Sequence, residues 1–156
     1  MMGYRPTARQ AQVVGVLREA GLPLEMSDFD DRLKKQKLFC IMKSFSPAID
    51  YPFNWYVYGP YSPKLAVDLF EVAEHKAELA NLDAQVEPPL VEATRRVVEK
   101  LGGRLADTQY LTLTASVLFF RRTGVSPSET VSRIRTAKPS FTEAAIRACM
   151  KEWEVE

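Results

Sequence analysis

Small polar residues, prolines and glycines divide this chain into segments of helical length, and this punctuation limits the fold more than any other feature of the sequence. A Ser, Thr or Asp side chain accepts a hydrogen bond from the free amides at the start of a helix. Proline fits the first helical position, and glycine often follows the last turn. Thr7 and Gln10 form a capping-box pattern that predicts a helix from there to Ala20, ended by Gly21.

The same signals predict six further helices. Ser27 is the predicted cap of the second, which ends before Pro47, and Ser62 followed by Pro63 opens the third. The last two begin at capping boxes in which serine and glutamate are three residues apart. These boxes are Ser126 with Glu129 and Ser140 with Glu143. The predicted helices after the first span about residues 28–45, 63–81, 89–101, 108–123, 127–136 and 141–154, with residues 82–89 as a linker.

Residues 107–124 fit two kinds of secondary structure. Apolar side chains alternate from Leu111 to Val117, as they do in a half-buried strand. A helix is preferred, because Asp107 or Thr108 can cap it and the apolar run is longer than a typical strand. The chain as a whole therefore predicts a mainly α fold: one domain over residues 1–156, with its core at 27–154, formed by a compact bundle of about seven helices with one short β element.

The predicted helix over residues 28–45 changes character along its length. Its second half, from Leu38 to Phe45, is apolar on almost every side, which is typical of a helix buried in the centre of a fold. Its first half carries four bases, which we expect nearer solvent. They are Arg32, Lys34, Lys35 and Lys37.

Gln36 is the only amide on the apolar stripe of that helix. An amide that is left unpaired inside a protein costs about 1–3 kcal/mol, so its side chain needs hydrogen-bond partners. Two are considered: the backbone of residues 59–62, or water at the edge of the helix. The first predicts a structural network that includes Gln36 and Ser62.

Four of the six tyrosines lie within residues 51–61. The aromatic and β-branched residues that alternate along residues 51–58 predict a short strand. Pro60 fixes its own backbone and favours an extended Gly59, so we expect a stiff corner before the helix at Pro63. Core packing is the simpler explanation of the rings, and a partly exposed surface that anchors a partner is the alternative. That surface would consist of Asn54, Tyr56, Tyr58 and Tyr61.

Composition and charge limit the classes of function. The net charge is +1, so the strongly basic balance of a dedicated nucleic-acid binder is missing. Acids gather over residues 68–92 and bases over 121–138, which indicates solvated helix faces or two poles that steer a partner. Cys40 and Cys149 are far apart and are expected to be reduced, buried hydrophobes. The sequence shows no signal-peptide core and no membrane-spanning run, so we expect a cytoplasmic protein that does not bind membranes.

Residue types that carry catalysis or bind metals are sparse. His75 is the only histidine, and its charged neighbours predict a surface residue rather than a catalytic one. The acids of residues 28–31 suit the first turn of a helix, where they complement the helix dipole, better than a metal site. No glycine-rich loop precedes a helix as a phosphate site requires. We therefore expect no cofactor and no metal, and an enzyme is disfavoured.

Four stretches of the sequence occur in a recognisable order within residues 30–153: LKKQKLFCIMKSF, FNWYVYGPYSPKLAVDL, YLTLTASVLFF and AKPSFTEAAIRACMKEW. This order resembles the YwgA-like family of uncharacterised prokaryotic proteins. Residues 36–38 match its QKL helix, residues 58–62 its YGPYS element, and Lys138 with Pro139 its late K-P element. More distantly, the chain is similar to the Panacea domain of antitoxins, which shares the QKL helix and the Y-G-P corner. The predicted helix over residues 7–20 lies outside the resemblance.

The resemblance favours a role without catalysis, because Panacea domains neutralise toxins by binding them or serve as adaptors. The first hypothesis is therefore a non-enzymatic protein-binding or regulatory module, antitoxin-like or defence-associated, whose partner is a toxin or a defence component. Its predicted contact residues are Lys37, Tyr56, Tyr58, Gly59, Pro60 and Tyr61.

Two other hypotheses come from different classes of protein. A transcriptional regulator would bind nucleic acid through basic helix faces, and its binding would weaken steeply with salt. Its predicted contacts are Arg32, Lys34, Lys35, Arg121, Arg122, Arg133, Arg135 and Lys138. An enzyme would need a site assembled from scattered Asp, Glu, Lys and Tyr residues, and no spacing in the sequence supports one.

Overall fold

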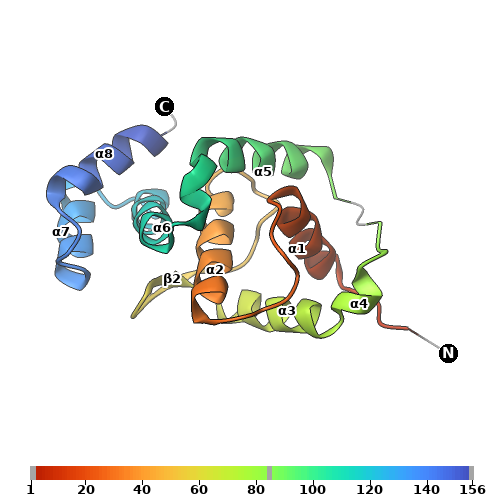
Figure 1. Cartoon of the computed structure of the whole chain (residues 1–156). Coiled ribbons are helices and arrows are strands. Elements are labelled where there is room, and N and C mark those ends of the chain that lie inside the picture. Colours follow the sequence, from red (N-terminus) through yellow and green to blue (C-terminus); the bar gives the residue numbers. More distant parts are fainter. Residues whose placement is uncertain (1–2, 84–85, 155–156) are drawn as a thin grey trace.

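Helices α2 and α6 lie at the centre of the fold, and the other helices pack around them (Figure 1). The computed structural model describes residues 3–83 and 86–154. Within them the α-helices are α1 (Ala8–Glu19), α2 (Phe29–Lys43), α3 (Pro63–Glu74), α4 (Lys76–Leu79), α5 (Pro88–Leu101), α6 (Thr108–Arg122), α7 (Pro127–Ala137) and α8 (Glu143–Trp153). A 3-10 helix, η1 (Gly102–Ala106), and two strands, β1 (Asn54–Tyr56) and β2 (Gly59–Tyr61), complete the described elements. The predicted mainly α bundle with one short β element is confirmed.

The central helices α2 and α6 run in the same direction. At their first turns, the Thr108 hydroxyl donates to Asp30 Oδ1 at 2.5 Å. At their last turns, Arg122 donates to the Cys40 carbonyl and to the Ser44 hydroxyl. Residues 36–42 of α2 and 111–118 of α6 are buried on every side, which confirms both the predicted buried helix and the choice of helix over strand for α6.

Charged side chains compensate the dipoles of this parallel pair. In parallel helices the partial positive charges of both N-termini meet at one end, and the partial negative charges of both C-termini meet at the other. Acids occupy the N-terminal end and bases occupy the C-terminal end. The acids are Asp28, Asp30, Asp31 and Asp107, and the bases are Lys43, Arg121 and Arg122. The acids of residues 28–31 therefore serve the helix, as predicted.

The remaining helices form two groups on either side of the central pair. Helix α1 packs on α3 and α5, whereas α7 and α8 pack on α6 and on each other. Figure 1 shows the first group next to α2 and the second group beyond α6. No helix in the described part of the chain is long and apolar enough to cross a membrane.

Several predicted helix starts are confirmed by side-chain caps. Thr7 and Gln10 form the complete capping box of α1, and the hydroxyl of Ser62 accepts from the Leu65 amide at 3.2 Å. Asp107 caps α6, and Ser126 caps α7. Each signal is local, because donor and acceptor lie within one helical turn.

Other predicted boundaries are wrong. Asp28, not Ser27, caps α2, because its carboxylate accepts from the Asp31 amide at 2.8 Å. Thr142, not Ser140, caps α8 in the same way. The predicted helix over residues 63–81 is broken at His75 into α3 and α4, and α5 begins one residue before the predicted Pro89. Residues 84 and 85 of the predicted linker lie outside the described residues.

The predicted corner at residues 59–62 is the second strand of a hairpin. Strand β1 pairs antiparallel with β2, with Asn54 opposite Tyr61 and Tyr56 opposite Gly59. The strand is thus shorter than the predicted 51–58, and Gly59 is not merely extended: its φ of +94° lies in the region that favours glycine. This backbone conformation lets the chain reverse through Val57 and Tyr58.

Candidate functional site

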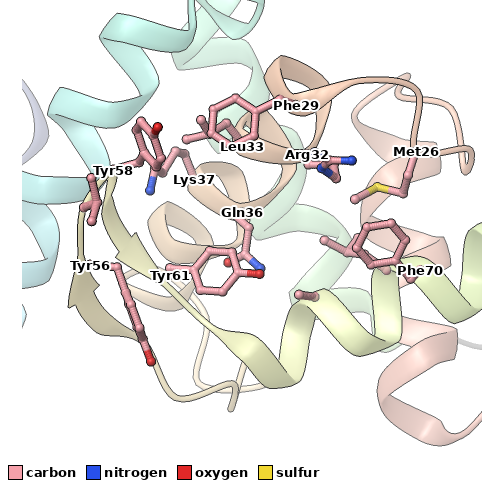
Figure 2. Close-up of a pocket in the computed structure, with 13 residues that line it drawn as sticks. Met26, Phe29, Arg32, Leu33, Gln36, Lys37, Tyr56, Tyr58, Tyr61 and Phe70 are labelled. Carbon is pink, nitrogen blue, oxygen red and sulfur yellow. The ribbon is translucent and has the colours of Figure 1, made fainter.

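A groove with a volume of about 610 Å³ opens between the first half of α2, the hairpin and the start of α3. Figure 2 shows Phe29 and Arg32 from α2 above the opening, Tyr56 and Tyr58 from the hairpin on one side, and Phe70 from α3 on the other. We call it the aromatic groove. Its other lining residues are Met26, Leu33, Gln36, Lys37, Val57, Tyr61, Ala66 and Leu69.

The large apolar side chains that are exposed in the described part of the molecule lie at this groove or, for Val67, next to it. Tyr58 is 54% exposed, Phe70 50% and Val57 83%. Phe29 and Tyr56 are nearly half exposed, and Val67 extends the same surface along α3. Single exposed apolar residues are ordinary, but a contiguous patch of them marks an interaction site or a ligand-binding groove.

The side chain of Gln36 fixes the hairpin to α2 through two hydrogen bonds. Its Nε2 donates to the Ser62 carbonyl at 2.9 Å, and its Oε1 accepts from the Ser62 amide at 3.0 Å. Gln36 is 2% exposed and Ser62 is fully buried, so water does not take the place of either hydrogen bond. Of the two partners considered from the sequence, the structure shows the backbone of residues 59–62.

Lys37 holds the strand between those contacts. Its Nζ donates to the Pro60 carbonyl at 2.6 Å, and the residue is 1% exposed. Burial, together with the nearby charge of Lys138, lowers the pKa of Lys37 to about 8. The expectation that the bases of α2 lie nearer solvent is thus wrong for Lys37, and also for Lys35, which is buried against Asp31 and the Glu25 carbonyl.

The predicted contact residues lie at two depths in the hairpin. Tyr56 and Tyr58 are exposed and Tyr61 is half-buried, so their rings form the wall of the groove. Gly59 and Pro60 are buried beneath them, as is Lys37. These three residues support the wall and offer little surface of their own.

Replacing Gly59 with alanine is expected to destabilise the hairpin. A Cβ at this position would lie 3.3 Å from Ser116 Oγ and 3.5 Å from Lys37 Nζ, on a backbone whose φ is +94°. Such backbone strain costs about 1–3 kcal/mol, and the crowding adds to it. Chemical denaturation measures the loss. Gly124→Ala is the matched control, since φ is +86° there but no atom lies within 4 Å; an equal loss in both variants would show that the crowding contributes nothing.

The residues predicted for nucleic-acid binding do not form one surface. Arg32, Lys34 and Lys35 lie at the start of α2, whereas Arg121 and Arg122 lie at the end of the parallel helix α6. A helix of 15 residues is about 22 Å long, so these groups occupy opposite ends of the pair. Most of them are also engaged within the chain. Lys34 pairs with Asp30, Lys35 with Asp31, Arg121 with Glu154 and Arg133 with Glu129, and Arg122 donates to the end of α2.

The histidine and the two cysteines, the residue types weighed for catalysis or metal binding, lie outside the aromatic groove. His75 stacks on Tyr4 and contacts Glu78 at the surface. Cys40 and Cys149 are free and buried, as predicted, and burial raises the pKa of the Cys149 thiol to about 11. Among the described residues, no group of three His, Cys, Asp or Glu side chains could hold a metal ion.

Sequence reasoning found the tyrosines of the groove but not Phe29 and Phe70 as its other wall. Phe70 lies outside the apolar face of α3 that carries Leu65, Leu69 and Val72. An aromatic residue on the polar side of an amphipathic helix was the signal that could have identified it. Its position opposite Phe29 is set by the packing of the hairpin on α2, which the sequence does not show.

No family model, curated protein or solved structure matches this chain. The resemblance to the YwgA-like family and the Panacea domain therefore stays a prediction from the motifs. Among the described residues, the aromatic groove is the feature whose geometry best indicates a function.

Proposed function

We propose that this protein is a non-enzymatic binding module and that the aromatic groove accepts a segment of a partner protein. The observation that carries the proposal is the gathering of exposed rings from three elements, Phe29, Tyr56, Tyr58 and Phe70, around one opening. Rigid aromatic side chains are the usual anchors of protein interfaces, because they bury much area at little cost in conformational entropy.

The shape of the surface favours an inserted segment over a flat contact. The groove is concave, and helical or extended segments bind by placing apolar side chains into such openings. Its hairpin wall is also held in place before any partner arrives, through Gln36 with Ser62 and Lys37 with Pro60. A wall that is already ordered loses less entropy on binding, which favours affinity.

The motifs support an antitoxin-like or defence-associated role for this module. The YGPYS element, residues 58–62, forms the hairpin wall, and the QKL element, residues 36–38, supplies the two side chains that hold it. The motifs that carry the resemblance to the Panacea domain thus belong to the hairpin wall of the groove and to its support. The proposed partner is accordingly a toxin or another defence component.

Loss of two anchors is expected to weaken binding at the groove strongly. Peptides that bind the protein are selected from a random display library, synthesised and titrated by fluorescence anisotropy. Tyr58→Ala combined with Phe70→Ala should weaken their binding by at least about 30-fold, the effect of losing one strong aromatic anchor. Both side chains are half exposed, so the variant should keep its fold, which its melting curve by circular dichroism verifies.

Phe141→Ala is the control, because it removes similar apolar area from a half-buried ring that does not line the groove. Selected peptides should bind this variant as they bind the parent protein. Peptides that bind the double variant equally well would exclude the groove as their site and contradict the proposed function.

A further inference from the structure

We infer that the partner segment presents a carboxylate that pairs with Arg32 at the rim of the aromatic groove; this inference rests on the proposed function. The apolar anchors of the partner fill the groove between the rings. An Asp or Glu side chain beside those anchors then meets the guanidinium between α2 and α3.

Arg32 lies between Phe29 and Phe70, the rings that α2 and α3 contribute to the groove. Its guanidinium carbon is 5.8 Å from the ring centroid of Phe29 and 5.9 Å from that of Phe70 (Figure 2). These distances are within the reach of cation–π contacts, and such contacts use none of the N–H donors of the guanidinium. The side chain is half-buried and lines the opening.

The side chain of Arg32 contacts the rings of Phe29 and Phe70. Among the described residues, it takes part in no ion pair. Most other arginines do have a carboxylate partner there. They are Arg9, Arg95, Arg96, Arg104, Arg121, Arg133 and Arg147. Unlike these arginines, Arg32 has no carboxylate partner among the described residues, and it lines the groove that the proposed partner would enter.

The acids nearest in sequence to Arg32 are already engaged. Asp28 accepts from the first-turn amide of α2, Asp30 accepts from Thr108 and lies 3.8 Å from Lys34, and Asp31 pairs with Lys35. No acidic residue of the described chain lines the groove, and its second charged lining residue is Lys37, also a base. The lining therefore carries positive charge alone.

A partner segment that covers the groove would remove Arg32 from water. An apolar segment that closes over Phe29 and Phe70 displaces water from the guanidinium, and a charge without water needs a charged or polar partner. A carboxylate meets this need best, because the planar guanidinium donates two parallel hydrogen bonds to its two oxygens. Apolar segments that carry an acid at this position are then preferred over those that carry a base.

The same display selection tests the inference when it is repeated with charge variants. Peptides selected on the parent protein should be enriched in Asp or Glu beside their apolar anchors. Arg32→Glu should lower their affinity by about tenfold, the scale of effect of placing like charges together, and should itself select peptides with Lys or Arg there. Arg96→Glu, which reverses an exposed charge on α5, should select the same acidic peptides as the parent protein.

The outcomes separate this inference from the proposed function. Groove-dependent peptides that are apolar but indifferent to the charge at residue 32 overturn the inference alone. An absence of groove-dependent peptides overturns the proposed function as well. A dimer in light scattering that Tyr58→Ala with Phe70→Ala dissociates would assign the groove to a second copy of the chain, and would also overturn the inference.

Discussion

Replacing Gln36 with leucine is expected to lower the free energy of unfolding by about 3 kcal/mol, because two buried backbone groups lose their partners at once. The amide and carbonyl of Ser62 are each bonded to the Gln36 side chain. Leucine has a similar volume and fits the apolar surroundings, so the loss reports the hydrogen bonds and not a cavity. Urea denaturation followed by circular dichroism measures it.

Gln36→Glu separates the two bonds. A carboxylate can accept from the Ser62 amide but cannot donate to the Ser62 carbonyl, whereas a protonated carboxyl can do both. Burial raises the pKa of such a carboxyl, so the stability it contributes is present at low pH and lost as pH rises. The deficit of Gln36→Glu should therefore be smaller at about pH 5 than at about pH 8. A Gln36→Leu variant as stable as the parent protein would show that the connection is not needed for folding.

Helix punctuation was readable from the sequence because its physical causes are local. The cap at Thr7, the proline after Ser62 and the glycine after α6 act within one turn, so the residues that decide the structure are adjacent in the chain. Neighbouring candidate caps compete at this range, which is why Asp28 replaces Ser27 and Thr142 replaces Ser140. The hairpin was missed for a related reason: Pro60 suggested a corner, while the positive φ of Gly59 produced a reversal.

Only part of the candidate site could be predicted from the sequence, because its residues come from three separate elements. The tyrosines of the hairpin stand out by their density along the chain, and the backbone of residues 59–62 was one of the two partners considered for Gln36. Phe29 and Arg32 gave no such signal, and Phe70 gave only its place on the polar side of α3. They meet because the hairpin docks on α2 and leads directly into α3, and only tertiary packing shows that arrangement.

Lys37 is the clearest case of a residue whose surroundings the sequence misjudged. A lysine in the polar half of a helix ordinarily extends its ammonium group to water. Here the side chain turns under the hairpin to the Pro60 carbonyl, and the other charges that affect its pKa are the Cys40 thiol and the like-charged Lys138. Desolvation without a carboxylate partner disfavours the charged form, so the pKa falls from the ordinary 10.5 to about 8.

The contribution of Lys37 to stability should therefore rise with pH, and a comparison with Lys37→Met separates it from groups such as the Cys149 thiol, whose raised pKa acts in the opposite direction. Between about pH 8 and pH 10.5 the unfolded chain holds a proton on Lys37 that the folded chain has released, so this group favours the folded state more as the pH rises. At about 1.4 kcal/mol for each pH unit, the gain over the window is about 3 kcal/mol. Lys37→Met removes this titration. Its free energy of unfolding, measured in urea at successive pH values, should therefore fall progressively below that of the parent protein across the same window. Lys64→Met, at an exposed position of α3, should show the same pH dependence as the parent protein. If Lys37→Met did so too, the pKa of Lys37 in the folded chain would have to be the ordinary one, and its ammonium group would have to be hydrated under the hairpin.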